Sequence, residues 1–75
     1  MQIKLSPVAT LKKFFGTGYL YEVSAGTTIK DLLLEYNVPL KMIMFATANK
    51  NSVSIQYEIN NGDEIVLYPF ISGGI

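Results

Sequence analysis

The alternation of apolar and polar residues along this chain predicts several short strands around one helix. Residues 2–5 read Gln-Ile-Lys-Leu, the period of two that is typical of a half-buried strand. Residues 19–24 are rich in aromatic and β-branched side chains and predict a second strand, paired with the first. The apolar run at 42–48 predicts a central strand that is buried on most of both faces. Residues 53–59 predict a short edge strand, with room for a single helical turn, and residues 64–68 predict the last strand.

The segment after the first strand predicts a short helix over residues 7–15. Ser6 can cap this helix, and Pro7 suits its first position because the fixed φ of proline is already helical. Apolar residues then recur at helical spacing, which is typical of a helix with one buried face. These residues are Val8, Leu11, Phe14 and Phe15.

The main helix is predicted to begin after Thr28. Thr28 and Asp31 have the spacing of a capping box, with aspartate in place of the usual glutamate. Apolar side chains then fall at i, i+3, i+4 and i+7 and form one face of an amphipathic helix. These side chains are Ile29, Leu32, Leu33 and Tyr36. Asn37 suits the left-handed residue that closes a helix, and Pro39 prevents its continuation.

Residues that favour turns separate these elements. Turns are predicted at 25–26, 49–51 and 60–63. Pro69 ends the last strand because proline cannot donate to the ladder of a sheet. The order of elements predicts an α+β fold, in which a mixed sheet of four to five strands packs on one main helix plus a short N-terminal helix. We expect one domain over residues 1–70 and a flexible C-terminal tail over residues 71–75.

The composition of the 75 residues argues against an enzyme. The chain contains no cysteine, no histidine and no arginine, so it lacks the commonest general base, the commonest zinc ligand and the bidentate phosphate clamp. Six lysines balance six acidic residues, and the pair Lys12-Lys13 is typical of a solvated face, so no nucleic-acid partner is expected. No apolar run reaches the roughly 18 residues of a membrane span, and no signal peptide is recognisable, so we expect a cytoplasmic protein.

The last six residues, Phe-Ile-Ser-Gly-Gly-Ile, are unusual for the end of a domain. Glycine loses the most backbone entropy on ordering and packs nothing, so Gly73 and Gly74 add little to a fold. A bare and narrow backbone is useful where a chain must enter a tight channel. Alternatively, the two glycines are only a frayed end, and Ile75 is a neutral extra residue.

Three segments in this order resemble the small sulfur-carrier proteins MoaD, the small subunit of molybdopterin synthase, and ThiS. Residues 26–33 read Gly-Thr-Thr-Ile-Lys-Asp-Leu-Leu, residues 62–65 read Gly-Asp-Glu-Ile, and residues 69–74 read Pro-Phe-Ile-Ser-Gly-Gly. Residues 2–16 and the tail resemble MoaD more than ThiS. The family consists of ubiquitin relatives with the β-grasp fold, so the resemblance implies a ubiquitin-like β-grasp here.

The chain departs from the family pattern at its end and in one turn. Many MoaD-like tails carry two prolines where this chain has Pro69 and Phe70, and residues 48–50 read Ala-Asn-Lys in place of Val-Asn-Gly. The largest departure is Ile75, because the reactive end of the family is normally the second glycine.

The resemblance implies that the chain carries sulfur on its C-terminus. In the family, an adenylating enzyme activates the terminal glycine with ATP, and the resulting thiocarboxylate delivers sulfur to an acceptor such as the large subunit of molybdopterin synthase. The carrier binds no cofactor and no metal. This assigns adenylation and thiocarboxylation to Gly74 and tail threading to Ser72 and Gly73. Ile75 would clash in a channel made for glycine, so we expect a processing metallopeptidase to cut between Gly74 and Ile75 first.

A partner-binding surface is predicted beside the tail. Alternation in the last strand puts Ile65 and Leu67 inward and leaves their neighbours exposed. Exposed apolar tracks of this kind often mark interfaces. The predicted interface residues are Val66, Tyr68, Phe70 and Ile71. Alternatively, Phe70 folds back onto the domain.

Two other functions fit the same sequence. The chain could be a ubiquitin-like modifier that is joined through Gly74 to lysines of other proteins, or a non-catalytic β-grasp module that only binds partners. The acceptor pathway, the fate of Ile75 and the oligomeric state stay open at this stage.

Overall fold

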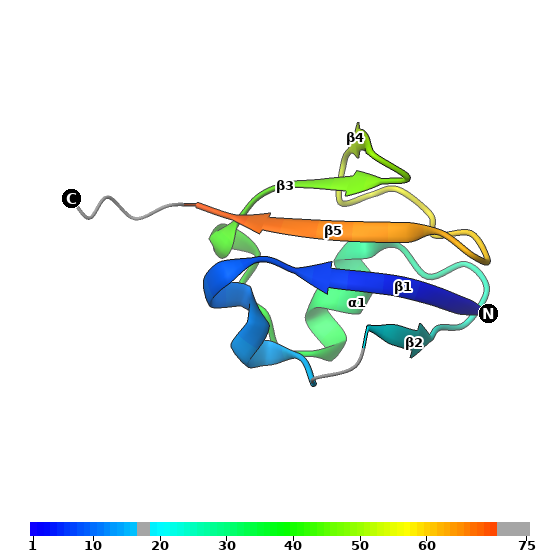
Figure 1. The fold of residues 1–75 in the computed structure, drawn as a ribbon, viewed down its shortest axis with the longest axis horizontal. Helices are drawn as coiled ribbons and strands as arrows, with labels where there is room; N and C mark the ends of the chain where they lie inside the picture. The colour runs from blue at the N-terminus through cyan, green and yellow to red at the C-terminus, as the bar shows by residue number, and fades with distance from the viewer. Residues whose placement is uncertain (17–18, 71–75) are drawn as a thin grey trace.

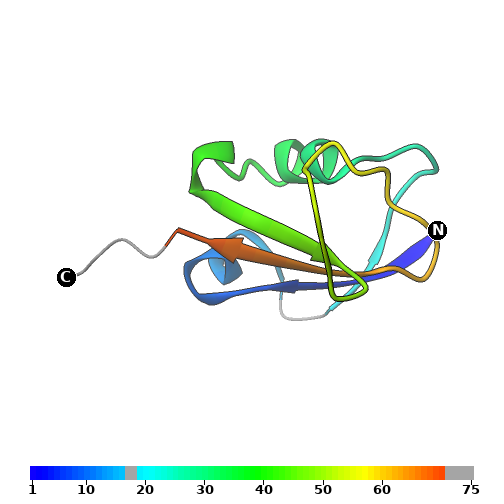
Figure 2. The same ribbon diagram turned by 90° about the horizontal axis from the view of Figure 1, so that it is seen from above.

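Five strands form one mixed sheet in the order β2-β1-β5-β3-β4 (Figure 1). The computed structural model describes residues 1–16 and 19–70. The strands are β1 (Gln2–Pro7), β2 (Leu20–Glu22), β3 (Ile43–Ala48), β4 (Asn51–Val53) and β5 (Glu64–Pro69). β1 and β5 run parallel, and the other neighbours are antiparallel. The helix α1 (Ile29–Glu35) lies on one side of this sheet (Figure 2), which confirms the predicted α+β arrangement.

The capping box that was predicted for the main helix is present. The Oγ1 atom of Thr28 accepts from the backbone N–H of Asp31 at 3.1 Å, and the Asp31 carboxylate accepts from the N–H of Thr28 at 3.1 Å. Ile29, Leu32 and Leu33 are buried, and Tyr36 is half-buried at the C-cap. Asn37 follows with φ 59°, the left-handed conformation expected of the residue that closes the helix.

The predicted helix start at Ser6 and Pro7 is wrong, because both residues belong to β1. Ser6 pairs with Val66 and Pro7 with Leu67 in the parallel ladder to β5. This pairing keeps the backbone extended until the N–H of Val8 donates to the carbonyl of Leu67 at 3.0 Å. A 3₁₀-helix, η1 (Ala9–Phe14), then forms without a side-chain cap.

β3 is an interior strand with a neighbour on each side, as predicted for 42–48, but it is not buried on both faces. β5 is the central strand, and β3 lies between it and the edge strand β4. Met42 belongs to a second 3₁₀-helix, η2 (Leu40–Met42), that precedes β3. Met44 and Phe45 are 46% and 38% exposed, because α1 covers only one face of the sheet and the register of β3 against β5 shifts between Ile43 and Phe45.

The remaining elements differ from the prediction mainly at their ends. β2 is shorter than 19–24 and pairs with β1 as expected. An edge strand is present, but β4 (Asn51–Val53) shares only Val53 with the predicted range 53–59, and it begins within the segment predicted as the 49–51 turn. Residues 55–56 form a turn. The alternating strands and one face of α1 enclose a single hydrophobic core. Its members are Ile3, Leu5, Leu11, Phe15, Ile29, Leu32, Leu33, Val38, Ile43, Ala46, Ala48, Ile59, Ile65 and Leu67.

Candidate functional site

The sheet holds β5, the strand that leads to the C-terminal residues, on both sides. β5 pairs with β1 from Glu64 to Leu67 and with β3 from Ile65 to Pro69. The N–H of Phe70 then donates to the carbonyl of Met42 at 3.0 Å. β5 ends on the side of the molecule where η1 and η2 lie, away from the N-terminus (Figure 1). The end of β5 and Phe70, the last described residue, are therefore well anchored.

The residues predicted to react lie outside the described part of the chain. Residues 71–75 include Ser72, Gly73, Gly74 and Ile75, and also Ile71 of the predicted interface. The tail boundary and the four reactive or processed positions therefore stay predictions. The described residues show the platform from which this segment continues.

A buried carboxylate organises the turn that leads into β5. Asp63 is 6% exposed and accepts hydrogen bonds from the Asn49 side chain at 2.8 Å, the Tyr57 hydroxyl at 2.7 Å and the Asn60 N–H at 2.9 Å. Burial alone would raise the pKa of Asp63, but these three hydrogen bonds outweigh burial and lower it. The hydrogen bond to Asp63 in turn raises the pKa of Tyr57. The sequence predicted only a turn at 60–63. The hydrogen bonds of Asp63 show that this turn also fixes the start of β5 to neighbouring segments.

The outer face of the sheet carries an aromatic pair beside the end of β5. Ile65 and Leu67 are fully buried, while Val66 and Tyr68 point outward and are half-buried, as the alternation predicted. Phe45 of β3 stacks on Tyr68 with ring centroids 4.3 Å apart and planes 10° apart. Sequence reasoning missed Phe45, because its exposure depends on the register of β3 and on the uncovered face of the sheet.

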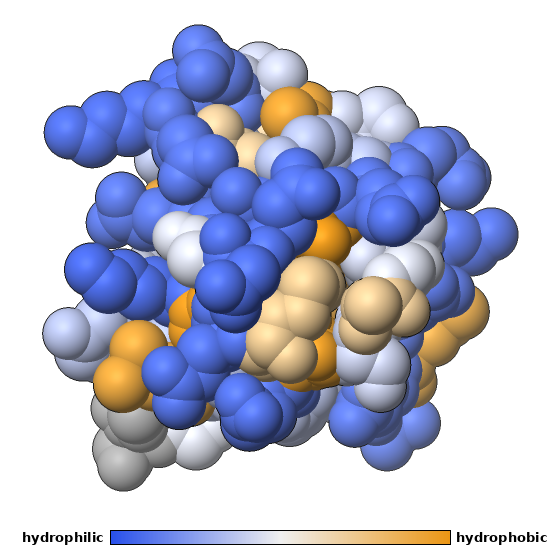
Figure 3. Space-filling model, turned by 90° about the vertical axis from the view of Figure 1, so that its right-hand side faces the viewer, coloured by the Kyte–Doolittle hydropathy of each residue, from blue (hydrophilic) through white to orange (hydrophobic). Residues whose placement is uncertain are grey.

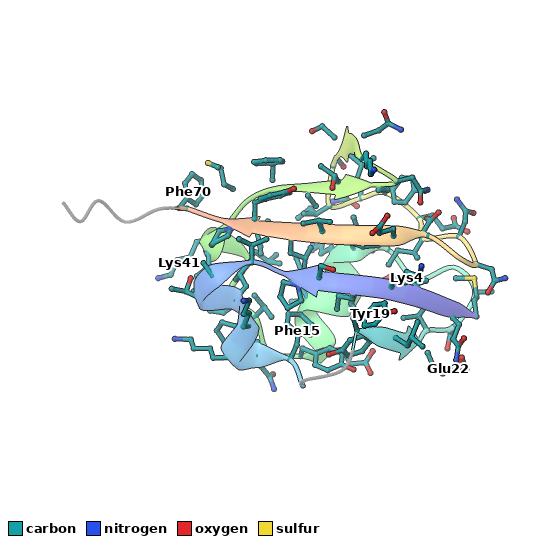
Figure 4. The ribbon with its side chains drawn as sticks, viewed as in Figure 1. Lys4, Phe15, Tyr19, Glu22, Lys41 and Phe70 are labelled. Atoms are coloured by element: carbon teal, nitrogen blue, oxygen red, sulfur yellow. The ribbon has the colours of Figure 1, made fainter. Side chains whose placement is uncertain are left out.

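Phe70 is 56% exposed, so its side chain does not fold back into the core. It forms one wall of a groove of about 540 Å³ at the end of β5, which we call the tail-base groove. Lys41 lies at the same end of the molecule (Figure 4). The groove is lined by Ala9, Thr10, Lys13, Lys41, Met42, Pro69 and Phe70. The end that carries the N-terminus is mostly hydrophilic, with scattered apolar areas (Figure 3).

The described residues offer no arrangement for metal chemistry and no orphaned buried polar group. Within 1–16 and 19–70, no group of three or more potential ligands from His, Cys, Asp and Glu is close enough to hold a metal ion. No buried side-chain nitrogen or oxygen in this part of the chain lacks a hydrogen-bond partner. No helix among these residues is long and apolar enough to cross a membrane.

Solved structures that share this fold include two that cover nearly the whole chain. SAMP1 from Haloferax volcanii matches with a TM-score of 0.69 and 18% identity, over 99% of this chain and 100% of that one. A ubiquitin-like protein from Caldiarchaeum subterraneum, a hyperthermophilic archaeon, matches with a TM-score of 0.58 and 18% identity, over 97% and 100%. The sequence matches no protein-family model and no curated protein. At this identity the likeness concerns the fold: the chain has the ubiquitin-like β-grasp, as predicted, and the likeness does not single out MoaD or ThiS.

Proposed function

We propose that this chain is a small sulfur-carrier protein, activated at Gly74 by partner enzymes. One observation carries the proposal: a diglycine begins four residues after the end of the central strand of a β-grasp sheet. The last backbone hydrogen bond described, from Phe70 to Met42, lies four residues before Gly74 in sequence. A firmly held strand end followed by the small residues Ser72, Gly73 and Gly74 suits a terminal carboxylate that must enter the active sites of two other proteins.

The chemistry divides between the carrier and its partners. A carboxylate oxygen of Gly74 would attack the α-phosphorus of ATP and release pyrophosphate, and a sulfide equivalent would then displace AMP from the acyl adenylate. The net change is one oxygen of the carboxylate replaced by sulfur. The chain contributes a carbonyl without a neighbouring Cβ and, through Pro69, a fixed φ at the base of the tail. The adenylating enzyme would supply the acid–base groups, since this chain has neither histidine nor cysteine.

Ile75 makes maturation the first step of the proposed pathway. A β-branched residue at the reacting carbon does not fit a channel made for glycine, so a metallopeptidase is expected to hydrolyse the bond between Gly74 and Ile75. The mature carrier would then deliver its sulfur to an acceptor enzyme, most simply one that builds a molybdopterin-type cofactor. This acceptor is proposed on the resemblance of the tail to the MoaD branch.

Intact mass measurement tests the activation step. The full chain and a chain that ends at Gly74 are each incubated with an adenylating enzyme of this class, ATP and a sulfur donor. We expect only the shortened chain to gain the mass of an oxygen-to-sulfur exchange. Gly74→Ala in the shortened chain is the matched control, because it adds one methyl group at the reacting carbon, and it should react poorly. Equal reaction of the full chain would refute the maturation step, and no reaction of either would refute the carrier function.

Phe70 offers a test of the predicted interface. Because Phe70 is more than half exposed, Phe70→Ala should leave the melting temperature almost unchanged. We expect the KM for activation of the shortened chain to rise about fivefold or more, which corresponds to about 1 kcal/mol or more of lost binding energy at an interface residue. Leu34→Ala is the control, since Leu34 is 54% exposed on α1. An equal effect of both substitutions would contradict an interface at Phe70.

A modifier function uses the same activated tail and has one observation in its favour. The stacked pair of Phe45 and Tyr68 leaves aromatic surface on the outer face of the sheet. After this chain is joined to a target, another protein could bind that surface and so recognise the modification. Tryptic digestion of proteins from the native cell distinguishes the two functions. Lysines that carry the C-terminal peptide of this chain through an isopeptide bond would favour the modifier, and thiocarboxylate without conjugates would favour the carrier.

A further inference from the structure

The tail-base groove combines apolar walls with positive charge. Met42, Pro69 and Phe70 supply apolar surface, and Lys13 and Lys41 are exposed cations among the lining residues. The three parts of the lining come from η1, η2 and the end of β5, which are far apart in sequence. A volume of about 540 Å³ is sufficient for one or two side chains of another molecule.

Positive charge is concentrated around this groove although the whole chain is neutral. Three of the six lysines, Lys12, Lys13 and Lys41, lie on η1 and η2, and neither of these two helices contains an acidic residue. None of the described residues that line the groove is acidic. A bound group should therefore be anionic at the rim, where the ammonium groups are, and apolar at the walls.

We propose that the tail-base groove binds an acidic segment of a partner protein, in which an aliphatic or aromatic side chain lies next to carboxylates. The apolar side chain would lie against Met42 and Phe70, and the carboxylates would face Lys13 and Lys41. A phosphate ligand such as a nucleotide fits less well. Its recognition favours the planar fork of arginine, which the chain lacks, and its sugar and phosphates would leave the apolar walls uncovered.

The docking role rests on the proposed function. Phe70 is the last described residue and also a wall of the groove, so a protein that binds the C-terminal residues must contact the groove as well. The same partner would therefore cover the groove and the start of the tail together. On this basis the adenylating enzyme is expected to present acidic and apolar residues beside the channel that receives the diglycine. Opposite charges at such a rim accelerate encounter and orient the two proteins.

Nuclear magnetic resonance titration of the full ¹⁵N-labelled chain tests the groove without any activating enzyme. The probe is a blocked hexapeptide of alternating glutamate and leucine, and its matched control carries glutamine in place of glutamate. We expect the glutamate peptide to shift the amide signals of Thr10, Lys13, Lys41 and Phe70, and the glutamine peptide to bind much more weakly. ATP and inorganic pyrophosphate are titrated separately as small anions.

Charge-reversal variants complete the test. Lys41→Glu is expected to weaken binding of the glutamate peptide about fivefold, the order of one exposed ion pair lost and replaced by repulsion. Lys30→Glu on α1 is the control with the same change in net charge, since Lys30 does not line the groove, and it should bind normally. Lys41 is exposed, so we expect Lys41→Glu to fold normally. Unchanged amide signals away from the groove would show that it does.

Several results would overturn the proposal. Equal binding of the two peptides would show that charge plays no role, and equal effects of the two lysine substitutions would show that the groove does not matter. Shifts of the same amides by ATP or pyrophosphate at lower concentration than by the peptide would indicate a small-anion site instead. If the peptide does not bind but Gly74 still gains sulfur, only the docking role is wrong. If the peptide binds and Gly74 never gains sulfur, only the proposed function is wrong.

Discussion

Replacing Asp63 by asparagine should destabilise the whole domain, because no orientation of the new amide satisfies the donors around it. The Oδ2 atom of Asp63 accepts from the Tyr57 hydroxyl and the Asn60 N–H, and Oδ1 accepts from Asn49 Nδ2. An asparagine that keeps the first two bonds turns its own NH₂ group toward the Asn49 NH₂ group. Asn49 cannot rotate without loss, since its Oδ1 atom accepts from the N–H of Glu64 at 3.0 Å.

The magnitude follows from the number and kind of bonds that change. A hydrogen bond to a charged group contributes about 1.5–3 kcal/mol, and at least one is lost while the others lose their charge. We expect Asp63→Asn to lower the free energy of unfolding by about 2–3 kcal/mol. A chain of 75 residues has about 4–11 kcal/mol in total, so this is a large fraction. The corresponding fall in melting temperature is about 10–20 °C for a domain of this size.

Thermal unfolding followed by circular dichroism at neutral pH measures this effect. Glu64→Gln is the matched control, since it makes the same chemical change at the exposed neighbouring residue and should shift the melting temperature little. A fall of less than about 3 °C for Asp63→Asn would mean that the three hydrogen bonds contribute almost nothing, which is below the range for bonds to a charged group.

The pH dependence supplies a second check on the same residue. Because the pKa of Asp63 is lowered in the folded state, its stabilising contribution is fully present above its ordinary value of 3.8 and is lost as the pH falls through the folded value. The gap in melting temperature between the original chain and Asp63→Asn should therefore narrow below about pH 4. A gap that is constant from neutral to acidic pH would show that the charge of Asp63 does not matter.

Three further predictions concern the helix, a turn and the outer face. Thr28→Ala removes the capping box and should cost about 1 kcal/mol in chemical denaturation, whereas Thr28→Ser should cost much less. Gly62→Ala should cost about 1–2 kcal/mol because Gly62 has φ 84°, and a neutral effect would show that the turn relaxes freely. A double-mutant cycle of Phe45→Ala and Tyr68→Ala should give a coupling energy of about 0.5–1.5 kcal/mol for the stacked rings, and additive effects would contradict their contact.

Part of the candidate site could be predicted from the sequence. The outward position of Val66 and Tyr68 can be predicted because successive side chains of an extended strand point to opposite faces of the sheet. The exposure of Phe70 follows from its place after Pro69, where the ladder ends. Phe45 could not be predicted, because its contact with Tyr68 requires the register between β3 and β5. Lys41 could not be assigned either, since only tertiary packing brings η2 beside the end of β5.

Features that depend on near neighbours along the chain can be predicted from the residues alone. These are the capping box of α1, the buried face of that helix, the turns, the alternation in β5 and the diglycine that follows it. The other features depend on contacts between segments that are far apart in the sequence. Parallel pairing with β5 kept Ser6 and Pro7 extended where local propensity favoured a helix. Met44 and Phe45 of β3 are exposed because α1 covers one face of the sheet and leaves the other uncovered. The reason is physical: local patterns report backbone preferences, whereas pairing partners, register and burial are set by contacts between distant segments.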